Sequence, residues 1–153
     1  MRRKGQLRAR QKGAVPGKKA TPQLPLCRCM NPREGVPIDA AGVVLIRRLA
    51  ELRPGRFAIS ILAHGLPAPE EQGPYDQYQG LVFVPEVIAW TFPLYTTPET
   101  PPTWAGTFAE STLDPTPNGI AQVRAVHSMT GAIGPVVLEG TLRNSQRRAT
   151  RSR

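Results

Sequence analysis

Cysteine is scarce in this sequence: Cys27 and Cys29 are the two among 153 residues, too few for the disulfide framework of a small secreted domain. Long apolar runs are absent too. The longest, residues 40–46, falls far short of the roughly 18 apolar residues of a membrane-spanning helix. The first 30 residues contain neither the apolar stretch of a secretory signal nor the serines of a transit peptide. We therefore expect a protein without a membrane span, located in the cytoplasm or associated with a particle.

Catalytic and metal-binding motifs are missing as well, since no G-x-S-x-G, H-E-x-x-H or phosphate-loop pattern occurs. His127 directly precedes Ser128, but neighbouring residues of a strand point to opposite faces, so the two do not form a base–nucleophile pair. The carboxylates considered as a catalytic pair are scattered over Glu70, Glu71, Asp76, Glu86, Glu99, Glu110, Asp114 and Glu139. The sequence therefore predicts a non-enzymatic protein without catalytic residues, cofactor or metal site. A hydrolase that uses His127 or these acids is kept as an alternative.

Positive charge is present in excess but is unevenly distributed. The net charge of +9 divides into +10 over residues 1–33, −6 over residues 34–142 and +5 over residues 143–153. Like charges and frequent Pro and Gly leave the two ends too little apolar surface to offset the entropy of ordering. We expect a disordered basic arm over residues 1–35, one folded domain over residues 36–142 and a disordered basic tail over residues 143–153.

The basic ends suit an electrostatic contact. Lys and Arg side chains neutralise phosphates and release counterions without reading bases, and these ends contain no aromatic residue on which a base could stack. We expect them to bind nucleic acid, another polyanion or the acidic bodies of neighbouring copies. The residues assigned to this contact are Arg2, Arg3, Lys4, Arg8, Arg10, Lys12, Lys18, Lys19, Arg147, Arg148, Arg151 and Arg153.

The middle of the chain has the pattern of an all-β fold. Seven apolar runs are separated by turn signals: residues 43–49, 57–63, 81–84, 87–92, 104–108, 120–127 and 136–142. Runs of this length and spacing predict a small antiparallel β-sandwich of about six to seven strands, jelly-roll or Ig-like. Pro85 and Pro93 adjoin two of the runs, which is typical of edge strands or bulges.

Residues 40–53 allow two interpretations. Asp39 could cap a helix with an apolar stripe of Ala41, Leu45, Leu49 and Leu52. Alternatively, Pro54 and Gly55 occupy the central positions of a type II turn between two strands. The strand interpretation is preferred, and the helix is kept as the alternative.

The last two runs predict a β-hairpin around the Gly-containing connection over residues 128–134. Alternation places Val123 in the core, and it places Val136, Leu138 and Leu142 together on one face. Arg124 is expected on the opposite face from Val123.

Two further features are candidate sites. Tyr75 and Tyr78 lie among Gln side chains in a segment bounded by Gly and Pro, which resembles an adaptable recognition loop, although their rings could equally lie on the sheet. Cys27 and Cys29 are spaced too closely for a typical zinc site and are candidates for a cross-link between copies.

The preferred hypothesis is a structural, self-assembling β-domain protein, a coat, shell or appendage subunit. It forms a homo-oligomer, and its basic ends contact a polyanion or neighbouring subunits. The alternative is a monomeric β-sandwich that binds a ligand through the Tyr75/Tyr78 loop.

Overall fold

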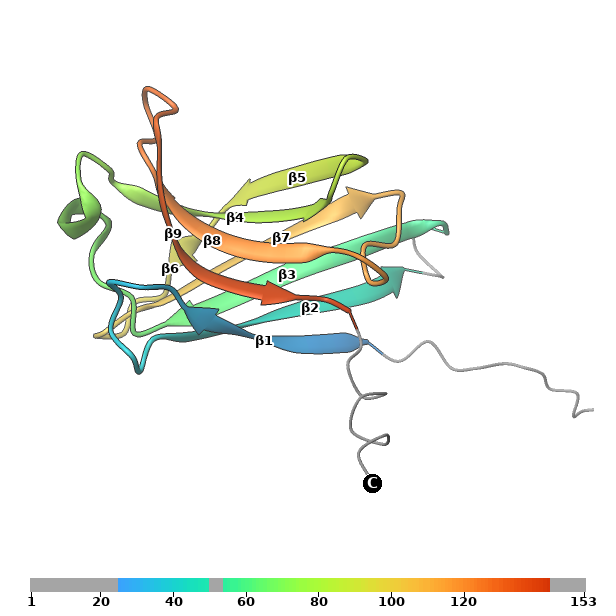
Figure 1. The fold of residues 1–153 in the computed structure, drawn as a ribbon, viewed down its shortest axis with the longest axis horizontal. Helices are drawn as coiled ribbons and strands as arrows, with labels where there is room; N and C mark the ends of the chain where they lie inside the picture. Colours follow the sequence, from blue (N-terminus) through green and yellow to red (C-terminus); the bar gives the residue numbers. More distant parts are fainter. Residues whose placement is uncertain (1–24, 50–53, 144–153) are drawn as a thin grey trace, which may run out of the picture.

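The computed structural model describes residues 25–49 and 54–143. Their regular structure is β throughout, apart from one turn of 3-10 helix, η3 (Pro69–Gln72). The strands are β1 (Leu26–Pro32), β2 (Ala41–Leu49), β3 (Arg56–His64), β4 (Gln77–Val84), β5 (Ile88–Pro93), β6 (Tyr95–Thr96), β7 (Thr103–Ser111), β8 (Ile120–Val126) and β9 (Ile133–Thr141). They form one antiparallel sheet in the order β5-β4-β8-β9-β1-β2-β3-β7-β6 (Figure 1).

This sheet folds over itself into two layers that nearly close into a barrel (Figure 1). We call β1, β2, β3, β7 and β6 sheet A, and β5, β4, β8, β9 and β1 sheet B. Strand β1 belongs to both, because Leu26–Met30 pair with β2 whereas Asn31 and Pro32 pair with β9. The core between the layers includes Val44, Ile59, Ile61, Tyr78, Val82, Val123 and Leu138, all with 1% exposure or less.

On the side opposite β1, the two layers meet through side-chain packing of β5 against β7. The Phe92 and Phe108 rings stack there, with centroids 6.4 Å apart. Position 106 has to be glycine at this seam, since a Cβ atom would lie 2.3 Å from the Pro93 carbonyl oxygen. β5 is an edge strand that ends at Pro93, as the proline positions predict.

The all-β prediction is confirmed, and each of the seven predicted runs overlaps one strand to within a residue at its ends, but the strand count differs. Two strands were not predicted, the two-residue β6 and the longer β1. β1 begins at Leu26, inside the predicted arm, so the folded domain starts earlier than residue 36. Its pattern was obscured by Arg28, which stays partly exposed and donates to the Cys27 carbonyl, while Met30 is buried. The rest of the predicted ends, residues 1–24 and 144–153, lies outside the described residues.

The described part of the ambiguous segment, up to Leu49, is strand β2, so the helix interpretation is wrong there. β2 pairs with β3 from Ala41 opposite His64 to Leu49 opposite Arg56. Gly55 has a φ of +81° where the predicted turn requires a left-handed residue.

The last hairpin is β8 paired with β9. Val123 and Leu138 lie opposite each other and are fully buried, as expected. The face predicted for Val136 is wrong: the register shifts after Val123, so Val136 pairs with Arg124, and Val137 is the extra residue that fills the core.

Candidate interaction surface

The outer face of sheet A, called the sheet-A face below, consists of alternate side chains that point away from the core. One row across the strands contains Cys29, Val43, Leu62, Ala105 and Tyr95. The next row contains Cys27, Leu45, Ser60 and Thr107. Ala41, His64 and Thr103 form a third row at one end of the strands, and Arg47 lies at the other end.

The sheet-A face combines exposed apolar surface with little charge. Leu62 is 49% exposed, Tyr95 is 63% exposed, and both cysteines are exposed. Among the side chains in these described rows, Arg47 is the one with a formal charge when histidine is neutral. Contiguous exposed apolar surface on a small domain is typical of an interaction site.

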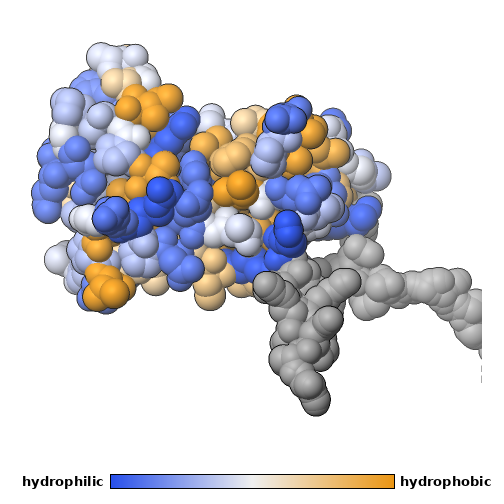
Figure 2. Space-filling view, viewed as in Figure 1, coloured by the Kyte–Doolittle hydropathy of each residue, from blue (hydrophilic) through white to orange (hydrophobic). Residues whose placement is uncertain are grey.

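A shallow groove of about 590 Å³ lies at the His64 end of this face. Its wall includes Cys29, Val43 and Leu62 from the face and Asp39 from the loop between β1 and β2. Ile38 in the same loop is 90% exposed, and Figure 2 shows hydrophobic surface at the tip of this loop, at the lower left. The apolar surface of the sheet-A face therefore continues onto this loop.

A chain of hydrogen bonds orients His64 at the rim of the groove. The Thr103 hydroxyl donates to Glu99 Oε2 at 2.8 Å, so it accepts from His64 Nδ1 at 2.9 Å. This places the proton of the neutral ring on Nδ1. Hydrogen bonds from Thr103 and Thr97, with His64 nearby, lower the pKa of Glu99. The rim therefore holds a carboxylate at neutral pH.

The outer face of sheet B is different in character. Glu139 accepts hydrogen bonds from Arg33 and Gln122, both at 2.7 Å. Arg124 Nε donates to Gln79 Oε1 at 2.9 Å, and partial burial lowers the pKa of the Arg124 guanidinium. Over β8 and β9, Figure 2 shows hydrophilic side chains interspersed with apolar ones. Sheet B thus presents polar groups that are bonded to one another.

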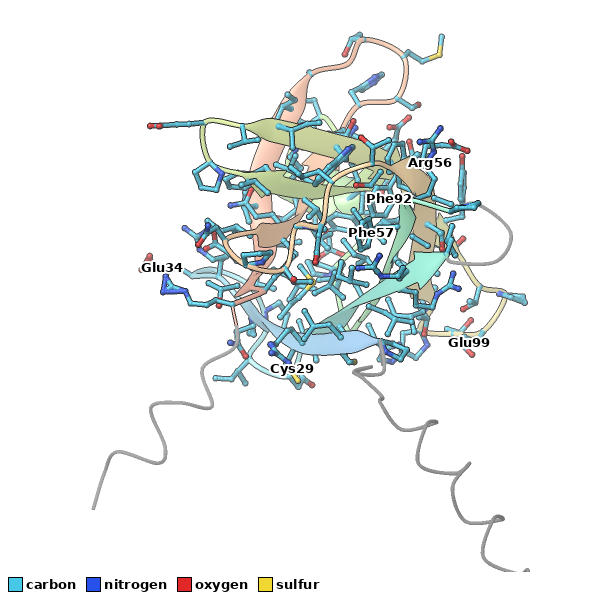
Figure 3. The ribbon with its side chains drawn as sticks, turned by 90° about the vertical axis from the view of Figure 1, so that its right-hand side faces the viewer. Cys29, Glu34, Arg56, Phe57, Phe92 and Glu99 are labelled. Carbon is cyan, nitrogen blue, oxygen red and sulfur yellow. The ribbon has the colours of Figure 1, made fainter. Side chains whose placement is uncertain are left out.

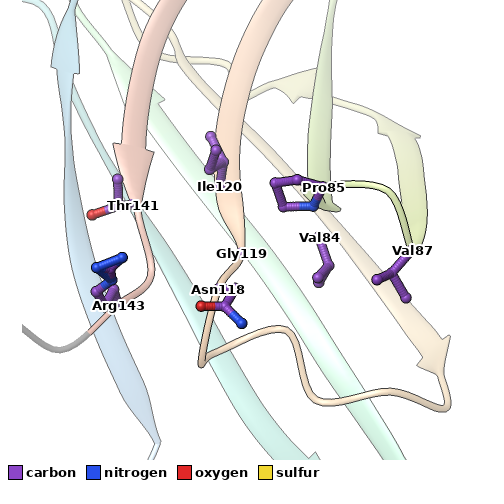
Figure 4. Close-up of a pocket in the computed structure, with 8 residues that line it drawn as sticks. All are labelled: Val84, Pro85, Val87, Asn118, Gly119, Ile120, Thr141 and Arg143. Carbon is purple, nitrogen blue, oxygen red and sulfur yellow. The ribbon is translucent and has the colours of Figure 1, made fainter.

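A second hollow, of about 670 Å³, lies where β8, β9 and the turn between β4 and β5 meet (Figure 4). Val84, Pro85, Val87 and Ile120 supply its apolar lining, and Asn118, Thr141 and Arg143 its polar lining. Arg143 is its one charged lining residue within the described part of the chain. The hollow offers neither an acid–base pair nor a thiol.

The two tyrosines proposed as ligand contacts pack into the domain instead. Tyr78 is fully buried in β4, and its hydroxyl donates to the Pro67 carbonyl at 2.7 Å. Burial also raises its pKa. The Tyr75 ring lies over Gly134, where a Cβ atom would come within 2.5 Å of it. The recognition-loop hypothesis is therefore corrected for Tyr78, whose ring lies in the core, whereas the Tyr75 ring is partly buried against it.

His127, Ser128 and Asp76 lie near one another without forming a catalytic triad. Both carboxylate oxygens of Asp76 accept from Ser128, one from its hydroxyl and one from its backbone N–H, each at 2.7 Å. These bonds lower the Asp76 pKa. His127 Nδ1 accepts from the backbone N–H groups of Met129 and Thr130, so the ring holds the hairpin loop.

Cys27 and Cys29 both lie on the sheet-A face, next to Leu45 and Val43, with free thiols. Figure 3 shows the Cys29 sulfur on the outside of the molecule. The structure thus places the two candidate cross-linking residues together on the sheet-A face.

The residues expected to bind a polyanion, Arg2 to Lys19 and Arg147 to Arg153, lie outside the described residues. Within residues 25–49 and 54–143, no three His, Cys, Asp or Glu side chains are grouped so as to hold a metal ion. In the same residues, no helix has the length and apolarity that crossing a membrane requires.

Sequence reasoning missed the sheet-A face. Its signal lies in Val43–Ile46, four apolar residues in succession, because a strand covered on one side normally alternates with polar residues. Val44 and Ile46 face the core, which leaves Val43 and Leu45 for the outer face.

Comparison with known proteins gives one family. The family model described as "YoqH: SPbeta prophage-derived uncharacterized protein YoqH" matches residues 22–146. The Bacillus subtilis (strain 168) protein with that description is 42% identical over 104 residues, which cover 65% of this chain and 68% of the relative. No solved structure matches the chain.

Proposed function

The chain belongs to the YoqH family, and within it we propose that this protein is a non-enzymatic structural subunit that self-associates through the sheet-A face. In this proposal it forms part of a coat, shell or appendage. Its basic ends contact a polyanion or neighbouring subunits.

One observation carries the proposal, the contrast between the two outer faces. The outer face of sheet B carries the charged side chains Arg124 and Glu139 in its middle, and Glu139 forms one hydrogen-bonded group with Arg33 and Gln122. Sheet A exposes Leu62 and Tyr95 among small uncharged neighbours. Depletion of charge and enrichment of aromatic and aliphatic side chains are features of the centre of a protein interface.

The arrangement of Asp76 and Ser128 supports a non-enzymatic role. The Ser128 hydroxyl donates to a carboxylate, and the nearby His127 Nδ1 is engaged by backbone N–H groups. A nucleophile would need a base that accepts its proton and a third group that orients the base. The contacts of these residues instead fix a loop.

The origin of the relative is compatible with this role. The Bacillus subtilis protein is described as prophage-derived. A subunit of a particle is one kind of protein that a prophage encodes. The contribution of the basic ends is proposed from their charge, since a net +10 over residues 1–33 favours binding to phosphates.

Light scattering coupled to size-exclusion chromatography tests the self-association. The full chain should elute as a multiple of its 16.7 kDa mass. Leu62→Arg places a charge in the centre of the sheet-A face and should shift the protein to the monomer. Thr91→Arg, at an exposed position on the outer face of β5, is the matched control and should leave the mass unchanged.

A monomeric wild-type chain at all concentrations would refute the proposal. Equal dissociation by Leu62→Arg and Thr91→Arg would locate the contact elsewhere. A cooperative thermal transition in each variant establishes that the substitutions preserve the fold.

A further inference from the structure

We infer that two copies pack sheet-A face against sheet-A face about a twofold axis running across the strands, with Cys27 of each copy opposite Cys29 of the other. This inference rests on the proposed self-association and specifies its geometry. The partner that we infer for the sheet-A face is a second copy of this chain.

The two ends of the sheet-A face carry opposite charge. At the His64 end, Asp39 lines the groove, and Glu99 accepts a hydrogen bond from Thr103. At the other end, Arg47 is exposed on the face. A face that is acidic at one end and basic at the other can be complementary to itself.

Arg56 and Glu110 lie at the same end as Arg47, with Arg56 Nε 3.7 Å from a Glu110 carboxylate oxygen. Their charges compensate each other, and Arg48 points to the other side of β2, over Phe57. Arg47 therefore determines the sign of the face at this end among the described residues. Figure 3 looks onto this end, with Arg56 and Phe57 labelled.

In a symmetric dimer of this kind, the twofold axis lies in the plane between the two faces. With the strands of the two copies aligned, the axis runs either along the strands or across them. An axis along the strands brings like ends together, so the acidic end of one copy, with Asp39 and Glu99, meets the acidic end of the other. An axis across the strands reverses the second copy, so that the acidic end of each meets Arg47 of the other. Charge complementarity favours the second orientation.

The position of the axis follows from the apolar rows. The rows that contain Val43 and Leu45 occupy the middle of the face, with the His64 row on one side and Arg47 on the other. An axis midway between them sets Val43 of one copy opposite Leu45 of the other. Because this axis runs across the strands, each strand lies opposite the same strand of the second copy. Strand β1 therefore faces β1, and Cys29 of one copy faces Cys27 of the other.

The size of the face suits a dimer. Five strands about 4.8 Å apart and four rows about 6.8 Å apart cover on the order of 500 Å² of flat area. Side-chain relief raises the accessible area toward the roughly 800 Å² that each partner buries in a standard interface. Face-to-face sheets also pack with their strands nearly aligned, as this orientation requires.

Cross-linking between two single-cysteine variants tests this geometry. Full-length Cys27→Ser and Cys29→Ser proteins are treated with dibromobimane, a short reagent with two thiol-reactive arms, separately and after mixing with time for subunit exchange. In a mixed dimer, the remaining Cys29 of one copy faces the remaining Cys27 of the other. The mixture should give at least about threefold more cross-linked, fluorescent dimer than either variant alone, since about half of its dimers are mixed.

The other results overturn the inference in distinguishable ways. Equal cross-linking of the mixture and of either variant alone contradicts the register. An oligomer by light scattering that yields no cross-linked dimer in any sample contradicts the orientation, while self-association stands. If light scattering shows that the protein is a monomer, both this inference and the proposed function are refuted.

Discussion

Tyr78 meets Trp104 edge-on, with ring centroids 5.1 Å apart and ring planes at 88°. The contact joins β4 of sheet B to β7 of sheet A through the middle of the core. Tyr78 also reaches the Pro67 carbonyl with its hydroxyl, so one side chain ties both layers and the segment that precedes η3.

Tyr78→Phe should lower the free energy of unfolding by about 1–2 kcal/mol, because it keeps the ring contact and leaves the Pro67 carbonyl without its donor. Urea denaturation measures the change. Tyr95→Phe, on an exposed ring, is the control and should have almost no effect. Equal effects of the two changes would contradict the role given to the Tyr78 hydroxyl.

Leu138→Ala should destabilise the domain by about 2–5 kcal/mol, because Leu138 is fully buried opposite Val123 and its removal leaves a cavity. Arg124→Ala, on the outer face of the adjacent strand, removes one hydrogen bond to Gln79 and should cost at most about 1 kcal/mol. The comparison is made by thermal or urea unfolding. Similar losses would mean that the register of the hairpin is different.

The Asp76 carboxyl should titrate below the ordinary range for aspartate, since Ser128 donates two hydrogen bonds to its charged form. A pKa that is lower in the folded state contributes stability above the unfolded pKa, and this contribution is lost as the pH falls through the folded value. NMR titration of the carboxyl carbon measures the midpoint. Ser128→Ala should raise it, and an unchanged midpoint would assign the shift to another cause.

Polyanion binding should be electrostatic and should reside in the basic ends. Residues 25–143 carry eight Arg against eleven acids, so a chain cut to these residues should bind DNA weakly. If about six charges of the full chain meet phosphates, log K should fall with log salt at a slope near −5. Titrations of both chains on one random-sequence oligonucleotide at several salt concentrations measure this slope. Undiminished binding by the shorter chain would place the contact in the folded domain.

Local sequence patterns predicted most of the strands. Alternation and turn residues were sufficient to predict β2, β3, β8 and β9. In each of these strands the spacing of apolar residues along the chain indicates which side chains face the core. β1 was not predictable in this way, since Arg28 occupies a position between Leu26 and Met30 in the alternation. Val137 faces the core because the register of β9 shifts by one residue against β8. This shift depends on how the two strands pair, so the sequence of either strand alone does not reveal it.

The candidate site was less predictable than the fold. Tyr78 resembled a recognition residue until the structure placed its ring in the core. The sheet-A face is assembled from strands far apart in the sequence, so its rows exist only once the pairing of β1, β2, β3 and β7 is known.

The strands at the two ends of the sheet order, β5 and β6, are consecutive in the chain and are separated only by Leu94. Leu94 is fully buried, and its N–H donates to the Tyr78 carbonyl, so this short link is itself fixed in the core. A strand from another molecule would therefore have to break the seam beside Gly106 before it could insert between these ends. Open-ended polymerisation by strand addition, the route that leads to amyloid fibres, is thereby hindered.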